Sequence, residues 1–413
     1  MKKYISEIIN NPLFSGSLIM VIGSNSANFL NLVYHFILGK MLGPSSYGEF
    51  AAIISLVGLL GIIPASLSLV VIKYISMAKS SMEILTLIDW FKTQALKISL
   101  IFSVVIFITS PLISSFLHIN KVIYLILVAF SFLFSIQSLL NRAILQGLLK
   151  FKEMVISIVT ENGFKLLISA LLIYLGFQVG GAISGFVVSI ILGWYITDFY
   201  LRYQRKQKKV KINLRQMLAF AMPVFVQSFA ITSLYSSDVI LVKHFFSSYD
   251  AGIYSALSTL GKIIFFGAGP IGAVMFPLIS QRHAKGVEYR KIFIYSLLVT
   301  LILATFVLLI YWLLPKVVIN LLYGVAYLNA ANLLVWFGIF IALFTLSSLL
   351  ITFHISLGHT KVVWLSVVAS IAQIVAVWFY HGSLLTVIII SILVTALLLG
   401  SLLIYSSYEK GSL

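Results

Sequence analysis

The chain has 413 residues, of which 61% are hydrophobic and only 9% are charged, and its formal net charge is +17. Soluble domains carry about 25% charged residues, so this composition excludes a soluble globular fold. The chain contains no cysteine, which excludes disulfides and thiolate metal sites. The positive charge does not indicate nucleic-acid binding, because no soluble domain exists to present a basic patch.

Apolar runs recur along the whole chain, and each is long enough to cross a hydrocarbon layer, which takes about 20 residues. They predict an all-α polytopic membrane protein with twelve transmembrane helices. In chain order the predicted spans are residues 14–38, 49–72, 95–117, 122–145, 153–177, 179–201, 217–241, 251–279, 292–314, 331–353, 362–380 and 384–406. Lys2 and Lys3 precede the first run as in a signal peptide. That run is too long for a signal peptide and no cleavage site follows it, so we predict a retained span.

The basic residues between the spans predict the orientation, because lysines and arginines in short loops stay on the cytoplasmic side. With the amino terminus inside, 22 of the 28 basic residues fall in inner loops or termini and four fall in outer loops. The other two, Lys165 and Lys262, lie within spans. This asymmetry predicts a multi-pass protein with both termini cytoplasmic, and it accounts for most of the net charge.

The two halves of the chain repeat each other. A shift of 204 residues places Gly48 on Gly252 within the similar stretches SYGEFAAIISL and DAGIYSALSTL, at matching places in two runs of six spans. A six-span unit ends on the side where it began, so the copies are parallel repeats. We therefore predict two six-helix bundles, residues 1–201 and 217–413. The basic cytoplasmic linker 202–216 joins them, either as a solvated segment anchored at acidic headgroups or with a binding role.

Polar side chains follow one face of the first helix in each half. Unpaired polar groups that face lipid cost several kcal/mol each, so these stripes face neighbouring helices or a water-filled cavity. The first stripe is Ser17, Ser24, Asn28, Asn31 and His35, and the second is Ser228, Thr232 and Tyr235, with Gln227 and Asp238 at its edge. We predict that the stripes line a central substrate cleft between the bundles, with hydrogen bonding between helices as the alternative.

Glycine and proline interrupt the second span and its counterpart, the eighth. In transporters built from repeats, such interruptions at corresponding places indicate the substrate path. The predicted hinge residues are Gly58, Gly61 and Pro64 in the second span and Gly269 and Pro270 in the eighth. Helix packing through small residues is the alternative explanation.

Charged residues inside spans are rare and functional by default. Glu161 and Lys165 form an i, i+4 pair in the fifth span, which is either self-neutralising or a coupling site for a proton or sodium ion. Asp238, near the outer end of the seventh span, is a further ion candidate and is expected to be hydrated. Arg142, near a cytoplasmic helix end, can reach the interface, and we include it among the residues of the predicted cleft.

Lys262 is the only charge in residues 252–280. It lies about 16 Å from the outer end of its span and so near the bilayer midplane. Nothing in its own helix can pair with it, so it needs a carboxylate from another helix, a water-filled cavity or an anionic ligand. Gly261 and Lys262 do not form a phosphate-binding loop, because Ile263 stands where that motif requires Ser or Thr. The seven histidines are scattered without a metal-binding motif, so we expect no metal and no cofactor.

Three stretches resemble a known family. The run ILGKMLGPSSYGEFAAIISL (residues 37–56) is similar to the opening signature of bacterial polysaccharide-export flippases of the Wzx type. The run SDVILVKHFFSSYDAGIYSAL (237–257) resembles the same family's Asp-then-Gly-x-Tyr pattern, and RAILQGLLKF (142–151) resembles its stretch after the fourth span. With twelve spans in two halves, the resemblance covers nearly the whole chain.

The resemblance implies a V-shaped pair of six-helix bundles of the multidrug/oligosaccharidyl-lipid/polysaccharide (MOP) exporter superfamily, in a bacterial inner membrane. It implies a flippase, not an enzyme, that moves undecaprenyl-pyrophosphate-linked oligosaccharide repeat units of O-antigen, capsule or another surface polysaccharide. Transport would proceed by alternating access. Because the sequence has no nucleotide-binding motif, we expect an ion gradient to drive it, with the substrate's own gradient or no driving force as the alternatives. A midplane lysine would offset the diphosphate charge. The implied partners are this lipid-linked oligosaccharide, the lipid bilayer and polysaccharide polymerase machinery, and nucleic acid is not among them.

Two other classes of protein remain open at this point. A drug/cation antiporter of the same superfamily would share the architecture, but its cleft is expected to be acidic, whereas the deepest charges here include two lysines. A membrane glycosyltransferase or polymerase needs catalytic carboxylates or histidines on a sizeable outer loop. The longest outer segment, around residues 315–330, has no carboxylate.

Overall fold

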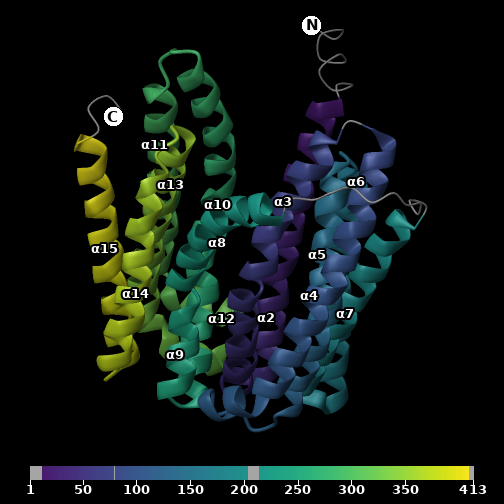
Figure 1. Cartoon of the computed structure of the whole chain (residues 1–413). Helices are drawn as coiled ribbons and strands as arrows, with labels where there is room; N and C mark the ends of the chain where they lie inside the picture. Colours follow the sequence, from purple (N-terminus) through teal and green to yellow (C-terminus); the bar gives the residue numbers. More distant parts are fainter. Residues whose placement is uncertain (1–11, 79, 203–213, 409–413) are drawn as a thin grey trace, which may run out of the picture. The chain divides into compact units, whose positions relative to one another are not determined.

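A computed structural model describes residues 12–78, 80–202 and 214–408, and this part of the chain contains helices and turns but no β-strand (Figure 1). The all-α prediction is therefore confirmed. Most of the predicted linker 202–216 lies outside the described residues, as do Lys2 and Lys3.

The helices follow the predicted apolar runs in order. In the N-terminal half they are α2 (Pro12–Leu60), α3 (Ile62–Met77), α4 (Ser81–Phe116), α5 (Ile123–Gly147), α6 (Phe151–Leu172), the π-helical turn η1 (Ile173–Phe177) and α7 (Gln178–Leu201). In the C-terminal half they are α8 (Leu214–Leu234), α9 (Ser237–Phe245), α10 (Ser248–Ala284), α11 (Arg290–Leu313), α12 (Pro315–Leu322), η2 (Val325–Ala330), α13 (Ala331–Ser356), η3 (Thr360–Val362), α14 (Val363–Phe379) and α15 (Leu384–Tyr408).

Two backbone breaks divide the longest helical segments into separate spans. Gly43 lies inside α2 with φ 69° and ψ 170°, and Gly176 lies between α6 and α7 with φ 93°. Glycine adopts such positive φ angles without the steric penalty of a Cβ atom. The described chain has nine helices long and apolar enough to cross a membrane, or ten with the pair Val224–Leu234 and Ser237–Phe245, which is bent by 46°. Dividing the two broken segments gives the twelve predicted transmembrane helices.

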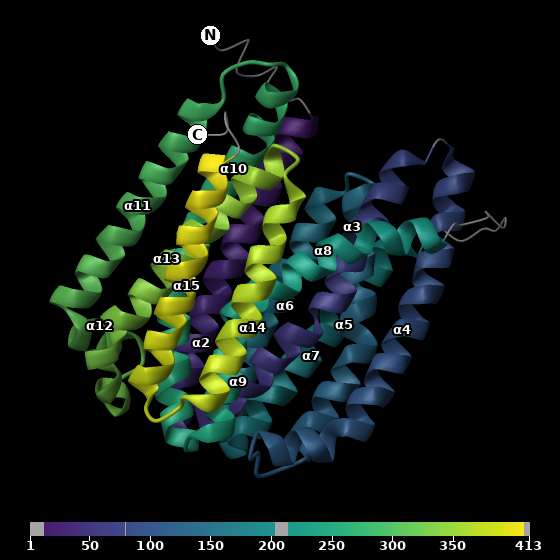
Figure 2. The same cartoon turned by 60° about the vertical axis from the view of Figure 1, so that its left-hand side comes forward.

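The chain forms two compact units. Unit 1 comprises Met1–Leu42 and Leu60–Phe225, and unit 2 comprises Gly43–Leu59 and Val226–Leu413. In unit 1, α5 packs against α4 and α7, and α6 packs against α7 (Figure 1). In unit 2, α13 packs against α10, α11 and α15 (Figure 2). Residues 43–59 come from the N-terminal half of the sequence but belong to unit 2.

Two glycines allow residues 43–59 to pack closely on α10. A Cβ atom at Gly252 would overlap the carbonyl oxygen of Pro44, and one at Gly48 would overlap the carbonyl oxygen of Ser248. These glycines are the two that the 204-residue shift superimposes. Membrane helices commonly pack through small residues that let their backbones approach closely. Here the repeat places Gly48 on one helix of the contact and Gly252 on the other.

Polar contacts hold the same segment in unit 2. The Tyr47 hydroxyl lies 3.2 Å from the Thr259 hydroxyl and 3.2 Å from the Tyr323 hydroxyl. Glu49 and Lys243 are both buried, with 5% and 1% of their surfaces exposed, and they attract each other electrostatically. A buried charge needs such a partner, so Glu49 and Lys243 help to fix residues 43–59 in place.

The predicted hinge residues occupy two kinds of position. Gly61 lies at the break between α2 and α3, and Pro64 follows in the first turn of α3. Gly58 lies within α2 and Gly269 within α10, each with open space where a Cβ atom would be. Pro270 is interior to α10, where it removes one backbone hydrogen bond. A hinge role for these residues stays a prediction.

Candidate substrate-binding site

Lys262 projects from α10 and is half-buried in unit 2. Its Nζ lies 5.2 Å from the centroid of the Tyr235 ring, a distance at which an aromatic face attracts a cation. Electrostatic attraction also links Lys262 to Asp238. Within the described residues, no carboxylate makes a direct ion pair with Lys262. The ammonium group therefore keeps N–H donors for a ligand.

Asp238 lies in the first turn of α9 and is only 1% exposed. Its carboxylate accepts hydrogen bonds from the Tyr254 hydroxyl at 2.8 Å and from the Val239 backbone N–H at 2.8 Å. The expectation of a hydrated Asp238 was therefore wrong, because Tyr254 of α10 covers the carboxylate. Asp238 is a satisfied buried anion that offsets the charge of Lys262.

The other polar residues of the seventh span also lie in unit 2. Gln227, Ser228 and Thr232 are half-buried on α8, and Thr232 hydrogen-bonds to Tyr235. The stripe predicted from spacing therefore leads along α8 to Tyr235, which contacts Lys262.

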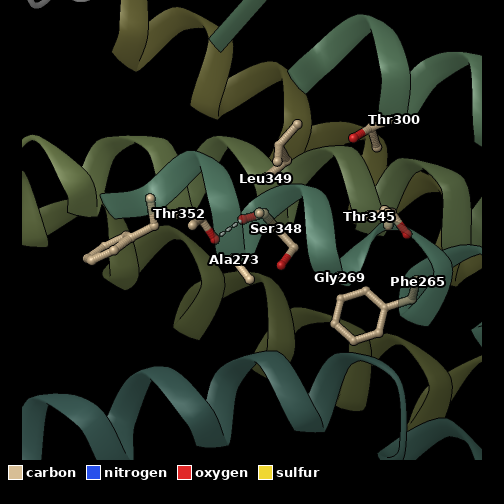
Figure 3. Close-up of a pocket in the computed structure, with 11 residues that line it drawn as sticks. Phe265, Gly269, Ala273, Thr300, Thr345, Ser348, Leu349 and Thr352 are labelled. Carbon is tan, nitrogen blue, oxygen red and sulfur yellow. Dashed lines mark hydrogen bonds between the residues drawn. The ribbon is translucent and has the colours of Figure 1, made fainter. Parts of the chain in front are cut away.

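A pocket of about 350 Å³ lies beside this group of residues, between α10, α11 and α13 (Figure 3). Phe265 lines the pocket and connects it to Tyr235, because the centroids of their rings are 5.7 Å apart. The lining comprises Phe265, Ala268, Gly269, Gly272, Ala273, Phe276, Thr300, Thr345, Ser348, Leu349 and Thr352. Pockets of this size hold small ligands or parts of larger ones.

Unit 1 contains a second cluster of charges, on α5 and α6. The Arg142 Nη2 lies 2.6 Å from the Glu161 Oε2. Arg142 also donates from Nε to the Ser157 hydroxyl at 3.0 Å and from Nη2 to the Ser157 carbonyl at 3.3 Å. Gly193 of α7 leaves room for this pair, because a Cβ atom there would overlap the Glu161 carboxylate.

The predicted partner of Glu161 needs correction. Lys165 attracts Glu161 electrostatically, but the direct ion pair of Glu161 is with Arg142. The Lys165 ammonium instead donates to the Asn31 side-chain oxygen at 2.7 Å and lies 4.6 Å from the centroid of the Tyr34 ring. Asn31 of the first stripe therefore joins the cluster.

The rest of the first stripe follows α2. His35 is half-buried and meets the Tyr34 ring edge-on at 5.4 Å, and Asn28, two turns earlier, is exposed. The structure thus brings Asn31, Glu161, Lys165 and Arg142 together in unit 1, and Tyr235, Asp238 and Lys262 together in unit 2. Among the residues that the structure describes, no group of three or more His, Asp or Glu is placed to hold a metal ion.

Comparison with known proteins begins with a family model described as "Polysaccharide biosynthesis protein", which matches residues 13–283, about two thirds of the chain. The chain belongs to the polysaccharide biosynthesis protein family. No curated protein matches it significantly in sequence.

Several solved structures share the fold of this family member. An inward-facing multidrug resistance MATE family transporter of the MOP superfamily matches with a TM-score of 0.74 and 15% identity, covering 94% of this chain and 96% of its own. The lipid II flippase MurJ, in an inward closed conformation, matches with a TM-score of 0.74 and 14% identity, covering 94% and 87%. A MOP superfamily transporter from Pyrococcus furiosus matches with a TM-score of 0.57 and 16% identity, covering 97% and 97%. The chain therefore has the fold of these transporters and is a multi-pass membrane protein.

Four residues of the clusters in this polysaccharide biosynthesis protein were missed by sequence reasoning: Tyr34, Ser157, Gly193 and Tyr254. Tyr34 follows Asn31 by three residues, which is a helical spacing and a usable signal. Tyr254 is the tyrosine of the Gly-x-Tyr pattern in residues 237–257. No pattern in the sequence indicates Ser157 or Gly193, because their roles depend on which helix packs against Glu161.

Proposed function

We propose that the chain is a flippase that moves polyprenyl-pyrophosphate-linked oligosaccharide repeat units across the bacterial cytoplasmic membrane by alternating access, with both termini cytoplasmic. Membership of the polysaccharide biosynthesis protein family supports this substrate class, and the likeness to a lipid II flippase supports the fold. The observation that carries the proposal is Lys262, a half-buried cation in a transmembrane helix with no direct ion pair among the described residues.

The chemistry of the substrate matches this cation. A diphosphate is anionic, and a lysine in a low-dielectric site attracts it strongly. Tyr235 and Asp238 attract the ammonium without hydrogen-bonding to it, so its N–H donors stay available to the diphosphate. The sugars carry hydroxyl groups, for which Asn28, Asn31, His35, Gln227 and Thr232 supply hydrogen-bond partners. The substrate would then pass to polysaccharide polymerase machinery, which makes O-antigen, capsule or a similar surface polymer.

A second candidate is a drug/cation antiporter, favoured by the equally high TM-score of the multidrug transporter. The two functions differ in the charge of the cargo. The chain in proteoliposomes is expected to bring a fluorescent undecaprenyl-diphosphate-linked oligosaccharide to the opposite leaflet, measured by reduction with membrane-impermeant dithionite, and to leave a cationic dye unmoved. Dye transport without movement of the saccharide would contradict the proposed function.

Glu161 is the proposed coupling residue, because its carboxylate lies within a transmembrane helix and pairs with Arg142 at 2.6 Å, a pairing with which a bound cation can compete. Glu161→Gln is expected to lower flipping driven by an imposed proton or sodium gradient severalfold, with little change in the amount of folded protein. Glu153→Gln, the same change in the first turn of α6, is the matched control. If Glu161→Gln responds to the gradient as the parent does, the pair with Arg142 is only structural.

A further inference from the structure

The pocket and Lys262 lie along one stripe of α10. Lys262, Phe265, Gly269, Gly272 and Phe276 are spaced by three, four, three and four residues, which places them on one face of the helix. Lys262 is one turn from Phe265 at the near end of the pocket, and Phe276 lies about 21 Å further along the axis than Lys262. The pocket lining contains no charged residue, and Lys262 lies beyond one end of it. A ligand that reaches from Lys262 into the pocket is therefore expected to be charged at the Lys262 end and apolar at the other.

The wall of the pocket suits an apolar occupant better than a sugar. Phe265, Ala268, Ala273, Phe276 and Leu349 present carbon atoms to it. Three of its four hydroxyls donate to backbone carbonyls of their own helices: Thr300 to Ser296 at 2.8 Å, Thr345 to Ile341 at 2.7 Å, and Thr352 to Ser348 at 2.8 Å. Figure 3 shows the last of these bonds. The hydroxyl protons of these three threonines are therefore already engaged and are not free to bind a sugar.

We propose that this pocket binds the isoprenoid segment next to the pyrophosphate of the substrate, while Lys262 binds the pyrophosphate itself. The inference rests on the proposed function and adds a subsite for the lipid tail to it. An ordinary apolar cavity would not require a cation at its end, whereas a polyprenyl diphosphate requires an apolar wall and a cation in that order. The pocket and Lys262 together would therefore recognise the part of the substrate where the charged diphosphate joins the hydrocarbon chain.

Substitution of two glycines in the pocket wall can test whether the pocket binds the isoprenoid segment. A Cβ atom at Gly269 would meet open space, and one at Gly272 would lie 3.9 Å from the nearest Leu349 methyl carbon. Leucine at either position therefore fills the pocket without striking the backbone. Gly400 in α15 also has open space at its Cβ position, so Gly400→Leu is a matched control in another helix of the same unit.

The experiment compares the binding of farnesyl diphosphate and of inorganic pyrophosphate to the full chain in phosphatidylcholine nanodiscs. Burial of about two methylene groups changes affinity about tenfold, so the parent is expected to bind farnesyl diphosphate at least tenfold more tightly than pyrophosphate. Gly269→Leu and Gly272→Leu are expected to remove that advantage and to leave pyrophosphate binding unchanged. Lys262→Ala is expected to weaken binding of both ligands, and Gly400→Leu of neither.

The outcomes separate the subsite from the proposed function. If farnesyl diphosphate keeps its advantage in both leucine variants at normal thermal stability, the tail subsite is wrong and the flippase proposal stands. If the parent binds neither diphosphate, the flippase proposal itself fails.

A second arm distinguishes the polyprenyl chain from the acyl chains of ordinary lipids. A farnesyl diphosphate analogue with a photoreactive group on its terminal isoprene is expected to label the pocket near Leu349 or Phe276. Excess undecaprenyl diphosphate should block this labelling, and excess phosphatidylglycerol should not. Equal protection by both lipids would show a general acyl-chain site and overturn the proposal.

Discussion

Lys262→Ala is expected to insert and fold normally yet to lose more than nine tenths of translocation activity. A lysine at mid-bilayer costs at least about 2.5–3.5 kcal/mol on insertion scales, so its removal relieves an unfavourable term. Asp238 keeps its hydrogen bonds to Tyr254 and Val239 in the variant, which limits the penalty of losing the cation. Delivery of lipid-linked saccharide to the outer leaflet, with protein level measured alongside, tests this expectation.

Other substitutions of Lys262 are expected to lower translocation activity by different amounts. Lys262→Arg keeps the charge and should retain part of the activity, whereas Lys262→Glu repels the diphosphate and should be inactive. Lys316→Ala, at an exposed lysine of α12, is the matched control and should behave as the parent. Full activity of Lys262→Ala at normal expression would show that the lysine does not contact substrate.

A different failure would identify a structural role for Lys262. Loss of both protein and activity in Lys262→Ala would mean that the attraction to Asp238 is needed for folding. The exchange of the two charges, Lys262→Asp with Asp238→Lys, would then restore the protein level. If the exchanged variant folds but does not transport, transport requires the cation to be at position 262 and not at position 238.

Gly252→Ala is expected to lower the stability of the folded protein by about 1–3 kcal/mol, the usual range for overpacking. The added Cβ atom would overlap the Pro44 carbonyl oxygen, and a backbone group cannot move aside as a side chain can. Residues 43–59 would then lose their close contact with α10. Thermal unfolding followed by size-exclusion fluorescence measures the effect.

Gly58→Ala is the control for this prediction. Gly58 lies in the same 43–59 segment, but its Cβ position is open, and alanine in a helix is about 1 kcal/mol more favourable than glycine. The two substitutions should therefore shift the unfolding temperature in opposite directions. An unchanged unfolding temperature in Gly252→Ala would show that the helices can separate without loss.

Much of the fold follows from the sequence. The apolar runs predict the twelve helices, since a hydrocarbon layer admits a long apolar segment only with its backbone groups paired internally. The assignment of residues 43–59 to unit 2 does not follow from the apolar runs, because the hydrophobicity of a helix does not determine which neighbouring helix it packs against. The correspondence of Gly48 and Gly252 indicated only a repeat in the sequence, and their close contact is a finding of the structure.

The candidate site shows the same limit. The isolation of Lys262 was visible in the sequence, whereas of Asn28, Asn31 and His35 only Asn31 contacts the cluster on α6. The ion pair of Glu161 was misassigned because helical spacing reports only neighbours within one helix. Arg142 reaches Glu161 from α5, and that approach depends on how α5, α6 and α7 pack.

The membership of residues 43–59 in unit 2 has a consequence for dividing the polypeptide. A cut in the polar stretch 202–216 would yield two fragments, neither of which contains a whole compact unit. The first fragment would carry residues 43–59 without the α10 surface that covers Gly48, and the second would carry α10 without its cover over Gly252. Independent production of the halves would therefore expose matching helix surfaces on both. Complementation between co-produced fragments would depend on residues 43–59 and on the part of α8 up to Phe225, which belongs to unit 1.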